Sequence, residues 1–145
     1  MFRRKDGIDL PETMTLPGVP ESVQTLVDFV CTHAKEIGFE ERRIDEVMKG
    51  IEEALNNVVR FACTDISGEI TVTCTVHEMG ALLVDILDSG RPFNMLVAST
   101  FPEAGDFTAS GEKPSTTRMK KSMKNIEYRR DGKKNRNILS CVISQ

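Results

Sequence analysis

One stretch of the chain, Ile51-Glu52-Glu53-Ala54-Leu55-Asn56-Asn57, decides how the rest of the sequence is interpreted. It lies in an amphipathic segment with helical spacing, and residues four apart on a helix lie one above the other. The carboxylate of Glu53 and the carboxamide of Asn57 are therefore expected to point the same way. An acid/base group and an oxygen ligand of a metal ion would need this arrangement to share one substrate. Such side chains also occur on the outer face of many surface helices, so the pair alone is weak evidence of function.

The helix that carries this pair is expected to run from about residue 40 to residue 62. Its apolar stripe consists of Ile44, Val47, Met48, Ile51, Leu55, Val58, Val59 and Ala62. At about 100° per residue, Glu53, Asn57 and Arg60 fall on a different sector. Gly50 borders Asn57, and a glycine inside a helix costs roughly 1 kcal/mol relative to alanine. Gly50 therefore indicates close approach of another backbone or a ligand, unless it marks a frayed turn without function.

Length and composition limit the class of protein. With 145 residues, 39% hydrophobic and 28% charged, the chain is expected to form a single globular domain over residues 1–145. No apolar run approaches the roughly 18 residues of a membrane-spanning helix, and the N-terminal residues lack the apolar stretch of a secretory signal. The four cysteines are widely spaced and form no C-x-x-C pair, so neither zinc nor redox chemistry is indicated. We therefore expect a cytoplasmic protein without membrane association.

The charge of the chain argues against direct nucleic-acid binding. Its net charge is −3 at pH 7, whereas phosphate recognition usually shows a basic excess. Positive charge is nevertheless concentrated between Arg118 and Arg136. This segment is either a solvated charged face or a surface for an acidic partner or nucleotide phosphates.

The remaining segments predict strands grouped beside helices. The expected elements are extended pieces at 8–10 and 14–16, helices at 21–37 and 40–62, a hairpin of strands 69–76 and 81–88, a helix at 118–125, and closing strands at 126–130 and 137–143. This order indicates an α+β protein, a two-layer α/β sandwich with helices on one face of a mixed sheet. Residues 89–117 lack clear periodicity, and a loop of that length in a compact domain is usually functional or disordered.

The order of these motifs resembles the GHKL superfamily of ATPases and kinases, and within it the anti-sigma-factor serine/threonine kinases. The stretch EALNNVVRFA, residues 53–62, is similar to the N box of that family, and DSGRPFN, residues 88–94, is similar to its G1 box. Residues 123–130 and Asn137-Ile138-Leu139 resemble the family's last helix and strands. The resemblance covers nearly the whole chain, from about Leu16 to Ile143.

The resemblance implies the Bergerat, or histidine kinase-like ATPase, fold, with a nucleotide lid at about 89–117 and with ATP and Mg²⁺ as cofactors. Asn57 would carry its amide oxygen to the Mg²⁺ ion, which prefers hard oxygen ligands. Glu53 would be the general base for a serine hydroxyl that attacks the γ-phosphate. Asp88 would accept a hydrogen bond from the adenine amine, and Gly90 would let the backbone approach the base. Without the resemblance, Asp88 is a polar turn residue at a strand end.

Two departures from the family pattern concern the phosphate end of the site. The family has a glycine-rich stretch there, whereas this chain has Gly111-Glu112-Lys113-Pro114-Ser115-Thr116-Thr117-Arg118-Met119, without paired glycines. Ser115, Thr116 and Thr117 are the candidate cofactor-binding residues in this region, because hydroxyls can donate to phosphate where backbone N–H groups are obstructed. The second departure is Arg60-Phe61-Ala62, where the family usually has a histidine. Phe61 is expected to pack, and Arg60 to face either a phosphate or solvent.

The sequence leaves two functional hypotheses. The first is an anti-sigma regulatory factor that acts as an ATP- and Mg²⁺-dependent serine/threonine kinase on a STAS-domain anti-sigma antagonist and that sequesters a sigma factor. The second is a degenerate GHKL-fold protein-binding module with weak or no ATP binding. Retention of Glu53, Asn57 and Asp88 favours the kinase, and loss of the loop glycines favours the binding module. A homodimer is implied by the family alone.

Overall fold

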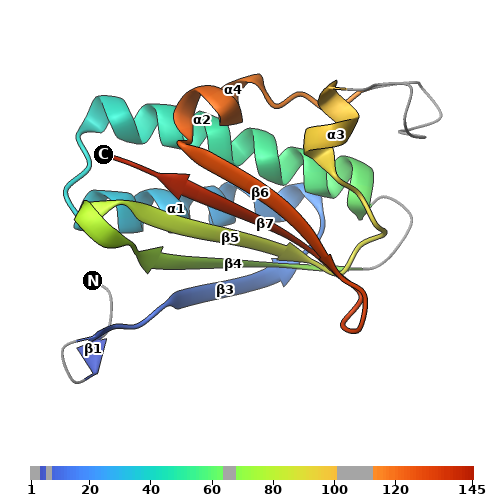
Figure 1. The fold of residues 1–145 in the computed structure, drawn as a ribbon, viewed down its shortest axis with the longest axis horizontal. Helices are drawn as coiled ribbons and strands as arrows, with labels where there is room; N and C mark the ends of the chain where they lie inside the picture. Colours follow the sequence, from blue (N-terminus) through green and yellow to red (C-terminus); the bar gives the residue numbers. More distant parts are fainter. Residues whose placement is uncertain (1–3, 6–7, 64–67, 101–112) are drawn as a thin grey trace.

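The computed structural model describes residues 4–5, 8–63, 68–100 and 113–145. These residues form two layers, a five-stranded sheet and a layer of helices on one of its faces (Figure 1). A separate pair of short strands, β1 (Arg4–Lys5) and β2 (Ile8–Asp9), precedes the sheet. The α+β architecture expected from the sequence is confirmed.

The main sheet is antiparallel throughout its described strands. Its members are β3 (Glu12–Pro17), β4 (Glu69–Val76), β5 (Leu82–Asp88), β6 (Asn125–Asp131) and β7 (Arg136–Ile143). Their order is β3-β4-β5-β7-β6, and every neighbouring pair runs in opposite directions. The expected mixed pairing is therefore wrong for these strands. β4–β5 and β6–β7 are hairpins with short turns, and a parallel pair would need a long crossover that such turns do not provide.

Helices cover one face of this sheet. They are α1 (Val23–Glu36), preceded by the 3₁₀ turn η1 (Pro20–Ser22), then α2 (Glu41–Asn57), which continues into the π-helical turn η2 (Val58–Ala62), and α4 (Thr117–Ser122). A further 3₁₀ turn, η3 (Glu78–Gly80), joins β4 to β5. In Figure 1, α2 and α4 lie above the strands and α1 lies behind them. The buried residues of the helices and the sheet form one hydrophobic core.

One helix was not expected from the sequence. α3 (Met95–Thr100) lies within the segment 89–117 that lacks periodicity, and residues 101–112 of that segment lie outside the described residues. Six residues are too few to establish a helical period. Its start is nevertheless marked by Asn94, whose Oδ1 accepts hydrogen bonds from Leu96 N at 3.0 Å and Val97 N at 3.4 Å. An asparagine in this position is a strong helix N-cap.

The core fills the space between the two layers. Leu26 of α1, and Ile51 and Leu55 of α2, have no exposed surface, and each contributes roughly 1.5–3 kcal/mol through burial. In β4, Ile70 and Val72 are fully buried on the helix side, while the residues between them are partly exposed. The alternation that predicted this strand thus marks a sheet with one covered face. Within the described ranges, no helix has the length and apolar composition needed to cross a membrane.

Gly50 is explained by close packing between α2 and α4. A Cβ atom at Gly50 would overlap the Ser122 hydroxyl and would lie 3.3 Å from Met123 Cε. Arg43, which precedes Gly50 in α2, also donates hydrogen bonds to the main-chain carbonyls of Ser122 and Ser144. The glycine therefore lets α4 rest directly on the helix that carries Glu53. The atoms that come close belong to the side chains of Ser122 and Met123, and not to the backbone or ligand that the sequence suggested.

Candidate functional site

Glu53 and Asn57 lie on the same side of α2, as their spacing predicts, and both contact one residue, Ser115. Ser115 Oγ donates a hydrogen bond to Glu53 Oε2 at 3.1 Å. Asn57 Nδ2 donates to the main-chain carbonyl of Ser115 at 2.8 Å. The residues expected to act as base and metal ligand therefore both hold the chain segment that leads into α4.

Glu53 also satisfies the first turn of α4. Its Oε1 atom accepts a hydrogen bond from the main-chain N–H of Met119 at 3.0 Å, whereas the N-cap residue Thr116 makes no capping bond with its own side chain. A carboxylate at a helix N-terminus is stabilised by the unpaired N–H groups and the helix dipole. The two oxygens of Glu53 are thus occupied by donors from the 115–119 segment.

The three hydroxyl residues expected to bind phosphates are placed differently. Ser115 is exposed and bonded to Glu53, Thr116 is only 3% exposed, and Thr117 is an exposed first residue of α4. Gly111, the first residue of the stretch 111–119, lies outside the described residues, as do residues 101–112 of the expected lid as a whole. Phosphate binding by the three hydroxyls stays a prediction, and the burial of Thr116 makes it the least accessible of them.

Asp88 ends β5 in a buried position. It is 3% exposed, and its Oδ1 atom accepts hydrogen bonds from Gly90 N and Asn137 Nδ2, both at 2.9 Å. Burial raises the pKa of the Asp88 carboxyl, while the hydrogen bonds from Asn137 and Gly90 and the charge of Arg130 oppose the rise. Its Oδ2 atom accepts no hydrogen bond from any described residue. Asp88 therefore keeps one oxygen, Oδ2, that is not fully enclosed and is available to a ligand.

A glycine is required at position 90 because the main chain of Ala62 passes close to it. A Cβ atom there would overlap the main-chain carbonyl of Ala62, 2.6 Å from its carbon, and would lie 2.9 Å from Asp88 Oδ1. The next residue, Arg91, donates its main-chain N–H to Ala62 O at 2.9 Å and its Nε to Phe61 O at 2.7 Å. These contacts bind the turn after β5 to the end of the α2–η2 helix, so the two motifs recognised in the sequence form one site.

Phe61 packs as expected. It has no exposed surface and stacks on Phe93, with ring centroids 5.3 Å apart. The guanidinium of Arg60 lies 5.4 Å from the Phe61 ring centroid, and Arg60 is an exposed residue. The aromatic pair therefore stabilises the junction between the two motifs, and contact of Arg60 with a phosphate stays a prediction.

Sequence reasoning missed Asn137 as a member of this site. Asn137 is 3% exposed and lies opposite Asp88 in the β5–β7 pairing. Its Oδ1 accepts hydrogen bonds from Tyr128 OH, Phe93 N and Arg130 Nη1, and its Nδ2 donates to Asp88 and to Arg91 O. The available signal was a polar residue, Asn137, in the same alternating set of β7 positions as buried apolar residues. It points to the site only once β7 is known to pair with β5.

Asn57 has an amide oxygen, the kind of ligand that a Mg²⁺ ion would need. Its Nδ2 group donates to Ser115 O and to Met95 Sδ, at 3.7 Å, whereas Oδ1 accepts no hydrogen bond from the described residues. Mg²⁺ favours oxygen ligands and usually keeps several waters beside substrate phosphates. In the described part of the chain, no group of three or more His, Cys, Asp or Glu residues could hold a metal ion. The donor set fits a metal held mainly by a nucleotide, with one amide oxygen from the protein.

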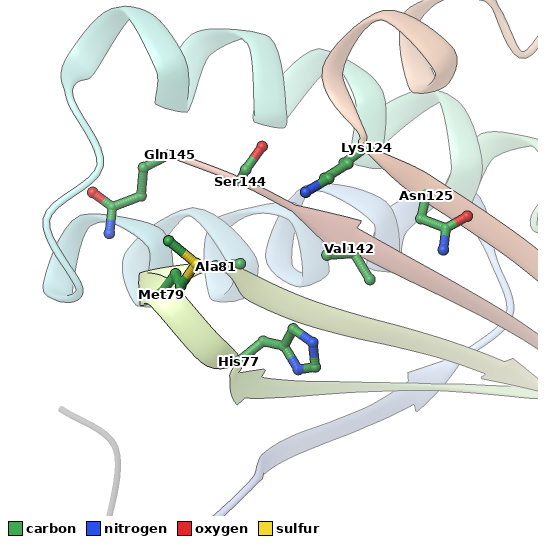
Figure 2. Close-up of a pocket in the computed structure, with 8 residues that line it drawn as sticks. All are labelled: His77, Met79, Ala81, Lys124, Asn125, Val142, Ser144 and Gln145. Carbon is green, nitrogen blue, oxygen red and sulfur yellow. The ribbon is translucent and has the colours of Figure 1, made fainter.

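A separate cavity of about 530 Å³ lies at the opposite end of the sheet, with His77, Met79, Lys124 and Gln145 in its wall (Figure 2). It adjoins the first residue of β5, whereas Asp88 is the last. At about 3.4 Å per residue, the strand separates the two places by roughly 20 Å. This cavity is therefore not part of the Glu53–Asn57–Asp88 site.

Comparison with known proteins places the chain in a family. The model of the histidine kinase-like ATPase domain matches residues 16–141. A search of curated proteins found no match. The fold is similar to that of the RsbU and RsbW domains of a Mycobacterium tuberculosis protein, with a TM-score of 0.63 and 15% identity over 92% of this chain and 32% of that chain. It is also similar to the histidine kinase domain of a blue-light activated histidine kinase from Erythrobacter litoralis, with a TM-score of 0.51 and 14% identity over 83% of this chain and 60% of that one.

These structural likenesses show the fold alone, because the identities are low, and the chain spans about a third of the first structure's length. The family model, by contrast, matches most of the sequence and includes Glu53, Asn57 and Asp88. The chain belongs to the histidine kinase-like ATPase domain family.

Proposed function

We propose that this domain binds ATP with Mg²⁺ and regulates transcription as an anti-sigma factor, phosphorylating a STAS-domain antagonist on serine or threonine and sequestering a sigma factor. The observation that carries the proposal is the state of Asp88. Its Oδ1 is held by Gly90 and Asn137, and its Oδ2 accepts no hydrogen bond from the described residues and is not fully enclosed. This oxygen on a mostly buried carboxyl would give a ligand one specific polar partner, and the exocyclic amine of adenine would supply the hydrogen-bond donor.

The other end of the site has the groups that phosphoryl transfer needs. Asn57 would give its Oδ1 to Mg²⁺, whose charge stabilises the transferred phosphoryl group when it is bound. Glu53 already accepts a hydrogen bond from a serine hydroxyl, that of Ser115. A general base must lie within hydrogen-bond reach of the hydroxyl that it deprotonates, so this contact supports Glu53 as the base for a substrate serine.

A serine from another protein that reached Glu53 would compete with the contacts that now occupy this carboxylate. Three hydrogen bonds join Glu53 and Asn57 to Ser115 and Met119. At about 1 kcal/mol each, displacing the two bonds of Glu53 would cost such a substrate roughly 2 kcal/mol, or about thirtyfold in affinity. The Asn57 bond uses Nδ2 and leaves Oδ1 open to Mg²⁺, so we expect ATP to bind in the micromolar range, with adenine recognition dominating.

The same contacts favour a second candidate function, the protein-binding module with weak or no ATP binding. Glu53 and Asn57 act in them as structural residues that hold α4 against α2. A domain whose phosphate end is closed by its own chain would regulate partners by docking alone. The two candidates differ in whether ATP binds, so nucleotide binding decides between them.

The test is calorimetric titration of ATP and ITP, each with Mg²⁺, into the wild type and Asp88→Asn. The asparagine keeps an oxygen for Gly90 and Asn137 but replaces the free oxygen with an NH₂ donor. Wild type should prefer ATP, and Asp88→Asn should lose ATP affinity by at least about tenfold and favour ITP, whose base presents an acceptor at that position.

Asp85→Ala is the matched control. Asp85 lies three residues earlier in β5 and therefore points to the other face of the sheet, so it should leave ATP binding unchanged. Absence of heat at high micromolar ATP, in protein shown to be folded by circular dichroism, would refute the kinase and leave the binding module.

Where ATP binds, Glu53→Gln tests the role of the base. The variant should retain nucleotide binding while phosphate transfer to a STAS-domain substrate falls by about 10²–10⁴-fold. Transfer at the wild-type rate would show that Glu53 is not the base. The resemblance of the sequence motifs to the anti-sigma-factor kinases supports the choice of STAS-domain and sigma-factor partners and of a homodimer. Co-purification with each partner class and light scattering would test these assignments.

A further inference from the structure

We infer that Ser115 is itself a phosphate acceptor, to which the domain transfers the γ-phosphate of ATP within its own chain. This modification rests on the proposed ATP-binding and kinase function and extends it, because it names an acceptor residue inside the protein. The acceptor is identified by the contacts of Ser115 with the two residues that the transfer would use.

Ser115 occupies the position of an acceptor serine. Its Oγ atom donates to Glu53 Oε2 at 3.1 Å, which is within the reach of a general base. Asn57 Nδ2 donates a hydrogen bond to the main-chain carbonyl of Ser115 at 2.8 Å. Ser115 is therefore held by both the expected base and the expected metal ligand. Ser115 is also an exposed residue, unlike its neighbour Thr116. Positioning of this kind removes most of the entropic cost of bringing the acceptor to the base.

The neighbouring hydroxyl residues are placed less well. Thr116 is 3% exposed, and its main-chain carbonyl is used by Lys120 N in the first turn of α4. Thr117 begins α4 and points to solvent as an exposed residue. Glu53 accepts its two hydrogen bonds from Ser115 Oγ and from Met119 N. Ser115 is therefore the hydroxyl residue of this segment that is bonded to the base.

The transfer balances with ATP as the only co-reactant. The Ser115 oxygen forms a bond to the γ-phosphorus while the bond from that phosphorus to the β,γ-bridging oxygen breaks, and ADP leaves. The hydroxyl proton passes to Glu53 Oε2 and then to solvent. The products are phosphoserine 115, ADP and one proton.

Phosphorylation would also change the site. Phosphoserine carries a charge of about −1.5 to −2 and has lost the hydroxyl proton that now bonds to Glu53. The two anionic groups would repel each other, so the Ser115–Met119 segment would separate from α2. Glu53 would then be free to accept a hydrogen bond from a serine hydroxyl of another protein. Phosphate transfer to Ser115 would thus switch the site from one closed by its own chain to one open to a substrate.

The experiment incubates the purified full chain with ATP and Mg²⁺ and locates phosphate by tandem mass spectrometry, while ATP binding is measured by calorimetry on the same samples. Wild type should accumulate phosphate on Ser115 at a rate per molecule that does not change over a tenfold range of protein concentration. Ser115→Ala should carry none, and Glu53→Gln should slow the transfer by about 10²-fold or more. Ser115→Thr keeps a hydroxyl and should restore phosphorylation, which excludes misfolding as the cause of the loss in Ser115→Ala.

Ser140→Ala, on β7 and three residues from the site residue Asn137, should leave the rate unchanged. Hydrogen exchange gives a second readout: the Met119 N–H, now bonded to Glu53, should exchange faster after phosphorylation. If ATP binds but Ser115 stays unmodified, or phosphate appears only elsewhere, the Ser115 assignment is overturned while the nucleotide site stands. If ATP does not bind, the proposed kinase and the Ser115 assignment both fail.

Discussion

Asn137→Ala should destabilise the domain by about 3 kcal/mol. Asn137 takes part in five hydrogen bonds with Asp88, Arg91, Phe93, Tyr128 and Arg130, and it is 3% exposed. Removing its side chain leaves the buried Asp88 carboxylate with one donor instead of two and leaves Arg91 O without this partner. A buried polar group without its partner costs about 1–3 kcal/mol, and relaxation around the smaller residue recovers part of the sum. For a domain of this size, 3 kcal/mol corresponds to a fall in Tm of about 6–12 °C.

Urea denaturation followed by circular dichroism would measure the change, with Asn125→Ala as the control. Asn125 is an exposed residue on the edge strand β6, so its loss should cost less than about 0.5 kcal/mol. Nuclear magnetic resonance titration gives a second readout. The pKa of Asp88 should rise further in Asn137→Ala, because the hydrogen bond from Asn137 opposes the effect of burial. A loss below about 1 kcal/mol, or an unchanged pKa of Asp88, would refute Asn137 as the residue that organises the site.

Three further changes test other parts of the fold. Gly50→Ala should destabilise despite alanine's helix preference of about 1 kcal/mol, because its Cβ overlaps the Ser122 hydroxyl; adding Ser122→Ala should restore most of the loss in urea denaturation. Met79→Gly should raise stability by about 0.5–1 kcal/mol in the same assay, since Met79 is fully exposed with φ 60° and ψ 28°, a conformation that glycine adopts without strain. Asp88→Asn should be more stable than wild type near neutral pH. The folded-state pKa of Asp88 is raised, so the wild type loses stability as pH rises from the unfolded value of 3.8 through the folded value, and the difference between the two proteins should vanish below that window.

Much of the fold follows from local sequence patterns. The periodicity of residues 40–62 predicted α2 and its continuation η2, and the alternation in 69–76 predicted β4. Helical and strand periods are properties of neighbouring residues, so a single sequence carries them. The six-residue helix α3 was missed because it is shorter than two turns, and the antiparallel pairing throughout the sheet was missed because strand direction depends on how the chain returns between strands.

The residues of the candidate site, too, were only partly predictable from the sequence. The sequence indicated Glu53, Asn57 and Asp88: helix spacing relates the first two, and the resemblance of residues 88–94 to the family's G1 box marks the third. It gave no means of knowing that Ser115, 62 residues from Glu53, bonds to that carboxylate, or that Asn137, 49 residues from Asp88, completes its environment. These contacts join segments whose proximity is set by the pairing of β5 with β7 and by the packing of α4 on α2.

The sequence by itself therefore determined which side chains are presented by each element, since that depends on the local period of the backbone. Only the tertiary structure decided what those side chains meet. It left one oxygen of Asp88 without a hydrogen-bond donor from the described residues, and it placed the 115–119 segment against both Glu53 and Asn57. The physical reason is that a hydrogen bond forms over about 3 Å, a distance that strand register and helix packing set for residues far apart in the chain.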